Sequence, residues 1–197
     1  MGVRLFKHIA IAATLLLGAP GAASADDAPE TRDWAVMVFA GQFVDNDFDE
    51  LINPAAIEGE DAGLAGVALS RKIAEPFEGL DIELEGQIVR HFGDQDHWEV
   101  NAPVVARWTA FPWDDAVDTS AAFGLGVSLA SEEPALEREI EGETQRVLAY
   151  WTAEIEVGPP DSDWSVVGRV HHRSTAFGLF GDEGGSNALA LGLRRRF

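Results

Sequence analysis

Apolar and polar residues alternate along most of this chain, in stretches separated by turn-forming residues. In the clearest stretch, residues 80–91, one face is apolar and the other is polar: Leu80, Ile82, Leu84 and Ile88 against Asp81, Glu83, Glu85 and Gln87. Neighbouring side chains of a β-strand point to opposite faces of its sheet. A period of two therefore predicts strands, whereas helices would show a period near 3.6.

The alternation predicts eight strands, at residues 34–44, 63–73, 80–91, 98–111, 120–130, 146–157, 165–175 and 187–197. Their connections also alternate. Short turns follow the second, fourth and sixth strands, and longer, acidic loops follow the first, fifth and seventh. Barrels of the outer membrane have short periplasmic turns and longer outer loops. The fold class we predict is therefore all-β, an eight-stranded antiparallel transmembrane β-barrel of the outer-membrane type.

A soluble antiparallel sandwich also alternates, but two features favour the membrane barrel. Charged residues lie deep within the polar faces, which suits a hydrated or salt-bridged lumen. Tryptophans fall near the predicted strand ends, where the aromatic girdles of barrels lie: Trp34, Trp98, Trp108, Trp113 and Trp164. The sequence ends in an aromatic residue, Phe197, as bacterial outer-membrane barrels commonly do. Eight strands enclose only enough space for side chains, so we expect no diffusion pore.

The first 25 residues do not alternate, and they predict a secretory signal peptide. Arg4 and Lys7 form a basic start, residues 9–17 are apolar, and an A-x-A cleavage sequence occupies residues 23–25. The apolar run is too short to cross a bilayer as a helix. We therefore expect residues 26–197 to be the exported part, a single β-barrel domain in the bacterial outer membrane.

Composition narrows the possible functions. The chain has no cysteine, which excludes disulfides and thiolate metal sites. Without the predicted signal peptide it has 12 basic residues against 34 acidic ones, a net charge of −22. Nucleic-acid binding requires the opposite sign of charge, so we exclude it. No later apolar run is long enough for a transmembrane helix, and only a closed barrel would satisfy its strand edges in lipid.

The candidate chemistry lies on the seventh predicted strand. Arg169, His171 and Arg173 share one face, which must be the lumen because charge is tolerated there. His172 and Ser174 share the other face, towards lipid, where polar side chains are costly. Their Cα atoms should lie about 6.5–7 Å apart, within reach of a contact between imidazole and hydroxyl. That pair is the core of an activated serine nucleophile, since the imidazole takes the hydroxyl proton.

Topology places this pair in the membrane. If the N-terminus of the barrel starts in the periplasm, odd-numbered strands run outward. His172 and Ser174 then lie at the level of the outer leaflet, which is lipid A in bacteria with lipopolysaccharide. An acyl ester of lipid A is the natural substrate for a lipid-facing serine at that position.

The sequence His172-Arg173-Ser174, on the penultimate strand of an eight-stranded barrel that ends in an aromatic residue, resembles the lipid A 3-O-deacylases of the PagL type. The resemblance is specific over residues 164–197 and architectural elsewhere. It implies ester hydrolysis without metal or other cofactor, with Ser174 as nucleophile and His172 as base. It also implies lipopolysaccharide, or lipid A, as the partner. In that family an acidic residue begins the last strand, and an asparagine commonly follows the serine.

This sequence departs from that pattern at two positions. Counting back in twos from the outward-facing last residue places Asn187 where the family has its acid. Asparagine can orient a histidine, but it cannot stabilise an imidazolium by charge. Glu183 or Asp182 in the preceding loop is an alternative acid. Thr175 follows the serine, so Gly178 or nearby backbone amides are the alternative for an oxyanion hole.

Two other functions stay open. A non-enzymatic small barrel that anchors, stabilises or adheres at the outer membrane predicts that His172 and Ser174 are separated or turned away from one another, as in a polar outer rim. A secreted, soluble β-sandwich that binds a ligand predicts fractionation with the periplasm or the medium.

We also expect several charged residues to be structural. His171 is expected to pair with Glu154 or Glu156 in the lumen, and Arg194 and Arg196 are expected to point inward and balance lumen acids such as those on the third strand.

Two acidic stretches are expected to be solvated loops. Residues 132–139 are a charge run of the kind that usually faces solvent. Residues 45–50 have the spacing of calcium ligands, but they lack the glycine and the terminal glutamate of an EF-hand loop.

Overall fold

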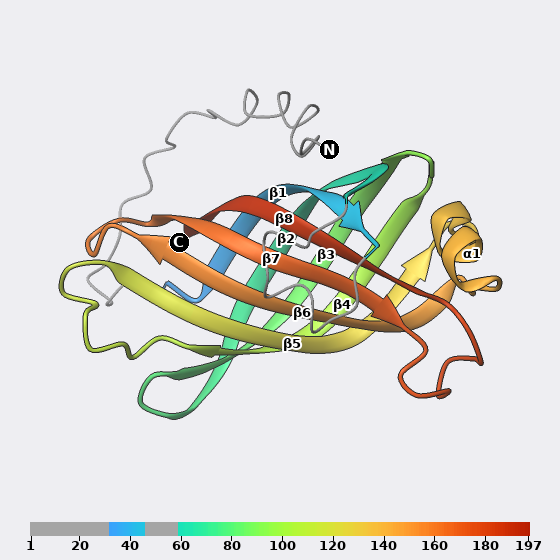
Figure 1. Ribbon diagram of the computed structural model, residues 1–197. Helices are drawn as coiled ribbons and strands as arrows, with labels where there is room; N and C mark the ends of the chain where they lie inside the picture. The colour runs from blue at the N-terminus through green and yellow to red at the C-terminus, as the bar shows by residue number, and fades with distance from the viewer. Residues whose placement is uncertain (1–31, 46–58) are drawn as a thin grey trace, which may run out of the picture.

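The eight strands form a closed antiparallel barrel in which the chain passes from each strand to its neighbour (Figure 1). The structure, a computed structural model, describes residues 32–45 and 59–197. The strands are β1 (Trp34–Val44), β2 (Gly59–Phe77), β3 (Leu80–Gly93), β4 (Trp98–Trp108), β5 (Asp118–Ala130), β6 (Val147–Gly158), β7 (Trp164–Ser174) and β8 (Gly185–Arg196). Antiparallel pairing of β1 with β8 closes the barrel. The predicted fold class is thereby confirmed.

The predicted strands match the observed ones closely in position. The largest difference is in β2, which spans Gly59–Phe77 where residues 63–73 were predicted. Its extra residues pair with the neighbouring strands, Gly59 with Val44 and Phe77 with Leu80. The strand is longer than predicted because pairing with its neighbours continues beyond the segment in which apolar and polar residues alternate. The predicted signal peptide, and residues 46–50 of the second acidic stretch, lie outside the described residues.

The two ends of the barrel differ. Residues 78–79, 109–117 and 159–163 connect strands at one end, which we call the turn end, where β1 starts and β8 finishes. Residues 94–97, 131–146 and 175–184 connect strands at the opposite, loop end. Helix α1 (Ala135–Glu141) lies at the loop end, far from the C-terminus (Figure 1). In the part of the chain that is described, no helix is both long and apolar enough to cross a bilayer.

The outward face of the barrel is apolar. Exposed aliphatic side chains cover every strand, among them Val38, Leu69, Ile88, Val104, Leu125, Ile155, Val166 and Leu191. A continuous apolar surface of this extent suits hydrocarbon and not water. Exposed aromatic side chains ring the turn end: Trp34, Phe77, Trp108, Trp113, Trp164 and Phe197. This girdle is where a membrane interface would lie.

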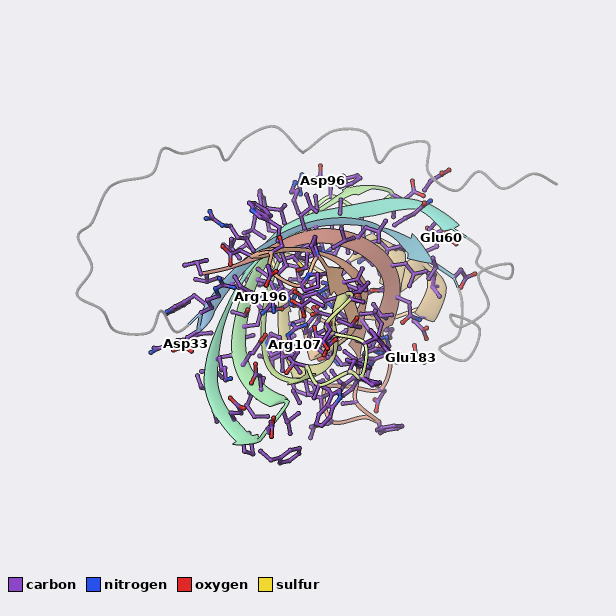
Figure 2. The ribbon with its side chains drawn as sticks, turned by 90° about the vertical axis from the view of Figure 1, so that its left-hand side faces the viewer. Asp33, Glu60, Asp96, Arg107, Glu183 and Arg196 are labelled. Carbon is purple, nitrogen blue, oxygen red and sulfur yellow. The ribbon has the colours of Figure 1, made fainter. Side chains whose placement is uncertain are left out.

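The inward face carries buried ion pairs. Arg107 of β4 lies inside the ring of strands when the barrel is seen from its turn end (Figure 2). Its guanidinium donates to Glu83 (3.0 Å), Glu154 (2.8 Å) and Glu156 (2.9 Å), which belong to β3 and β6. Arg194 also contacts Glu83 (3.0 Å) and Glu156 (3.1 Å). Buried charges require such pairing, because an unpaired ion away from water is strongly unfavourable.

The expected pairing of His171 with Glu154 or Glu156 is wrong. His171 contacts Glu99 of β4 instead, with 3.0 Å between Nε2 and Oε1. The cause is register: Glu154 lies opposite Arg169 on β7, and that arginine takes it as a partner.

The sequence predicted that Arg194 and Arg196 of β8 point inward and balance lumen acids, and this prediction is confirmed in part. Arg194 is buried among the lumen acids, and Arg196 pairs with Asp118 at the turn end.

Replacement of Arg107 by methionine should destabilise the folded barrel by about 3–5 kcal/mol, because three buried carboxylates would lose a shared cation. Urea unfolding of the refolded protein in detergent micelles would measure the loss. The matched control is Arg71→Met, which removes an exposed, outward cation lying over the Trp34 ring, 5.2 Å from its centroid. That change should cost about 1 kcal/mol or less. Equal losses for the two variants would contradict a role for the lumen network in stability.

Candidate functional site

His172 and Ser174 lie on the lipid-facing side of β7, at its loop end. Burial alternates along this strand, so that Arg169, His171 and Arg173 are buried in the lumen while His172 and Ser174 are half-buried on the outer wall. This arrangement follows from the period of two, and it matches the faces that the sequence predicted. The two side chains are therefore neighbours on one surface of the barrel.

Asn187 of β8 holds the ring of His172. The two residues pair directly across the strands, and 2.6 Å separates His172 Nδ1 from Asn187 Oδ1. A carbonyl oxygen only accepts, so Nδ1 carries the proton and donates it. In that neutral tautomer, Nε2 keeps its lone pair and is free to act as a base.

Trp151 of β6 packs against the same ring from the other side. It pairs with His172 across the strands, and their ring centroids are 4.5 Å apart. The imidazole therefore lies between an indole and an amide, which fix its orientation. Sequence reasoning missed Trp151 as part of the site. The alternation places it on the outward face of its strand, but only the register between β6 and β7 brings it to His172.

Ser174 is surrounded by small residues. Its cross-strand neighbours are Ala149 on β6 and Gly185 on β8. Because both are small, they leave space beside the hydroxyl on the outer surface. Ser174 Oγ accepts a hydrogen bond from the amide of Ala176, at 3.4 Å. Among the described residues, no hydrogen bond joins His172 to Ser174. Catalytic contacts are often long or unformed without substrate.

The segment that follows Ser174 has an unusual backbone. Ala176, Phe177 and Gly178 all have positive φ angles, of 50°, 59° and 88°. Non-glycine residues rarely adopt this conformation, and such strain concentrates at functional sites. Successive amides in turns of this kind can form a concave site for an anion. Backbone donors are therefore close to the serine.

The alternative acids do not contact His172. Asp182 and Glu183 are both exposed in the loop between β7 and β8. Glu183 Oε2 lies 3.4 Å from the position that a Cβ on Gly142 would occupy, so this carboxylate faces the segment that follows α1. Of the three candidates, Asn187 is the one that the structure brings to the imidazole.

The acidic run 132–139 is the solvated segment that the sequence predicted only in part, since Glu132, Glu133, Arg138 and Glu139 are exposed but other residues are not. Part of it forms α1, whose residues Leu136 and Glu137 are buried at the loop end of the barrel. Glu137 accepts hydrogen bonds from Thr144 Oγ1 (2.6 Å) and Ser186 Oγ (2.9 Å). The prediction is wrong for Glu137 because an inward cation, Arg173, lies 3.2 Å from this carboxylate and gives it a buried partner.

Glu137 therefore contacts both strands that carry the candidate site, β7 and β8. Arg173 lies between His172 and Ser174 on β7, and Ser186 precedes Asn187 on β8. One carboxylate of α1 thus contacts both strands from the lumen side, while the candidate site occupies their outer side.

Comparison with solved structures identifies other barrels of this kind. The chain is similar to the crystal structure of the outer membrane enzyme PagL, with a TM-score of 0.62 and 14% identity, over 83% of this chain and 99% of that one. It is also similar to the crystal structure of Neisserial surface protein A (NspA), with a TM-score of 0.50 and 8% identity, over 85% of this chain and 98% of that one. No family model and no curated protein sequence matches the chain. At these identities the likenesses show the fold, an outer-membrane β-barrel.

Burial raises the pKa of Glu137 above its ordinary value of 4.5, against the opposing effect of Arg173. The folded protein then binds this proton more tightly than the unfolded chain does. The resulting stabilisation is present below about pH 4.5 and is lost as the pH rises through the folded value. We expect the stability of the wild type relative to Glu137→Gln to fall with rising pH, in urea unfolding from pH 4 upward. A relative stability that grows with pH would contradict this assignment.

Proposed function

We propose that this chain is an outer-membrane serine esterase that removes an acyl chain from lipid A or a related lipid. The observation that carries the proposal is the 2.6 Å hydrogen bond from His172 to Asn187 on the lipid-facing wall, with Ser174 next along the same face. A lipid-facing polar group is costly, and a catalytic role accounts for three such groups at one point of a largely apolar surface.

The place of the site in the barrel supports a lipid substrate. With the turn end on the periplasmic side and its aromatic girdle at that membrane interface, the loop end lies at the outer leaflet, and so do His172 and Ser174. Lipid A fills that leaflet in bacteria with lipopolysaccharide. The similarity to PagL, described as an outer membrane enzyme, is in line with an enzymatic barrel of this size.

In the proposed reaction, Ser174 Oγ attacks the carbonyl carbon of the ester while His172 Nε2 takes the hydroxyl proton. The bond between that carbon and the alcohol oxygen then breaks, and His172 returns the proton to the leaving alcohol. Water attacks the acyl-serine in a second round, giving its proton to Nε2. Proton transfer to Ser174 Oγ then releases the fatty acid and restores the enzyme.

The oxyanion of each tetrahedral intermediate needs donors that are already in place. We assign this role to backbone amides of residues 176–178, whose positive φ angles turn the chain beside the serine. Asn187 orients the imidazole in this scheme but does not offset the positive charge that His172 acquires. Glu183, which lies beside Gly142, has no part in it.

The alternative is a non-enzymatic small barrel. It is favoured by the contact of Ser174 Oγ with the Ala176 amide, which turns the hydroxyl towards the loop. NspA, a surface protein by its name, has the same architecture. The two functions differ in one outcome, the fate of lipid A acyl chains.

Mass spectrometry of lipid A from a host that makes this protein should reveal loss of one acyl chain, and Ser174→Ala should abolish that loss. Ser162→Ala is the matched control, because Ser162 lies in the turn before β7, at the opposite end of the barrel. Heat-dependent migration in gels would verify that each variant is folded in the membrane. An unchanged lipid A mass with a folded wild type, or activity that survives Ser174→Ala, would overturn the proposed reaction.

Asn187→Ala should lower the deacylation rate about 5- to 30-fold, because the imidazole loses a hydrogen bond worth about 1–2 kcal/mol. Asn187→Asp should instead increase the rate, since a carboxylate also stabilises the imidazolium. Initial rates on lipid A in mixed micelles would measure both effects. If alanine and aspartate variants were equally slow, or equally unaffected, Asn187 would not be the residue that orients His172.

A further inference from the structure

Three potential metal ligands meet in the lumen near the loop end. His91 of β3, Glu99 of β4 and His171 of β7 are each at most 1% exposed. Their ligand atoms all lie within 4.8 Å of one another. His91 Nε2 is 2.8 Å from Glu99 Oε2, and His171 Nε2 is 3.0 Å from Glu99 Oε1. The three side chains thus meet in the lumen from β3 and β4 on one side and from β7 on the other.

Several buried polar atoms at this point have no hydrogen-bond partner. His91 Nε2 and Glu99 Oε2 are two of them, because their close approach lacks the alignment of a hydrogen bond. His97 Nε2, whose ring stacks on that of His91 with 4.0 Å between the centroids, is also without one. Most buried polar groups in folded proteins are satisfied, so a cluster of exceptions calls for a missing ligand.

We propose that His91, Glu99 and His171 bind a divalent transition-metal cation, with Zn²⁺ as the best match. Two imidazoles and one carboxylate are a ligand set that zinc accepts in four-coordinate sites, and the chain has no thiolate to offer a softer ion. Ligand atoms about 2 Å from a tetrahedral ion lie roughly 3.3 Å apart. The present distances of 2.8 and 3.0 Å from the imidazole nitrogens to the Glu99 oxygens are close to this spacing, and water would complete the site.

The residues around the cluster fit this role. Metal-bound histidines normally use their second ring nitrogen for a hydrogen bond that fixes the ring. His171 Nδ1 lies 3.2 Å from the Tyr150 hydroxyl, and His91 Nδ1 lies 3.2 Å from the Gln95 amide group. If the Gln95 side-chain oxygen faces His91 Nδ1, both histidines have a hydrogen-bond acceptor for the ring nitrogen that does not bind the metal.

The charge nearby leaves Glu99 available to the cation. Arg173 Nη1 is 3.8 Å from Glu99 Oε2, beyond hydrogen-bond distance. The same arginine lies closer to Glu137, with 3.2 Å from Nε to Oε1, and it donates to the Gln145 carbonyl at 3.0 Å. Arg173 therefore pairs more closely with Glu137 than with Glu99, and the Glu99 carboxylate keeps negative charge for a cation.

A cation at this position would connect β3 and β4 to β7 across the lumen, directly behind the wall that carries His172. This inference concerns the lumen alone and does not rest on esterase activity. Since the ligands are fully buried, the ion enters as the barrel closes during folding.

The protein should be refolded in detergent with Zn²⁺, freed of loosely held metal by EDTA and gel filtration, and analysed by elemental mass spectrometry. We expect about one zinc per chain and a higher urea midpoint than after refolding in EDTA. Refolding with Co²⁺ should give the visible absorption of a four-coordinate nitrogen and oxygen site, which tests the wild type without any substitution.

The double variant His91→Gln/His171→Gln should weaken zinc binding at least about 100-fold. The control is His172→Gln, one residue away on the outer face, which should retain the metal. Wild-type protein that retains no zinc and shows no cobalt absorption would overturn the site. So would full retention by a folded double variant, or loss of zinc from the control alone.

Discussion

The pairing of charges inside a narrow lumen filled with side chains is the constraint on which the rest of this structure depends. A barrel whose outer wall is apolar keeps its polar side chains inside, and eight strands leave no room for bulk water there. Three arginines, Arg107, Arg169 and Arg194, therefore share the carboxylates of β3 and β6. Because each strand alternates, fixing these inward residues also fixes every outward one. The outward position of His172 and Ser174 follows from the inward position of Arg169 and Arg173.

The candidate site depends on register as much as on alternation. His172 meets Asn187 and Trp151 only because β6, β7 and β8 pair at one particular offset. Glu137 bridges two of these strands at the loop end, where it contacts β7 through Arg173 and β8 through Ser186. The helix that carries this carboxylate thus has a structural role in a loop whose composition suggests only solvation.

The sequence predicts the fold well because a period of two is a local signal. It identifies the face of each residue on β7, and counting back from Phe197 correctly places Asn187 on the outer wall. It does not reveal which residues of different strands are neighbours, since that depends on offsets set by the whole barrel. The contacts of His172 with Trp151, of His171 with Glu99 and of Glu137 with Arg173 all depend on such offsets. None of them has a signature within its own segment.

The wall between lumen and lipid is one strand thick, and on β7 the two sides alternate residue by residue. A substitution on this strand therefore acts on one side only, and the other side keeps its pattern. A deletion or insertion of a single residue acts on both, since it would carry Arg173 into lipid and His172 into the lumen. Among homologous barrels, β7 should accordingly vary in composition but hardly in length, whereas the neighbouring loops are free to change in both.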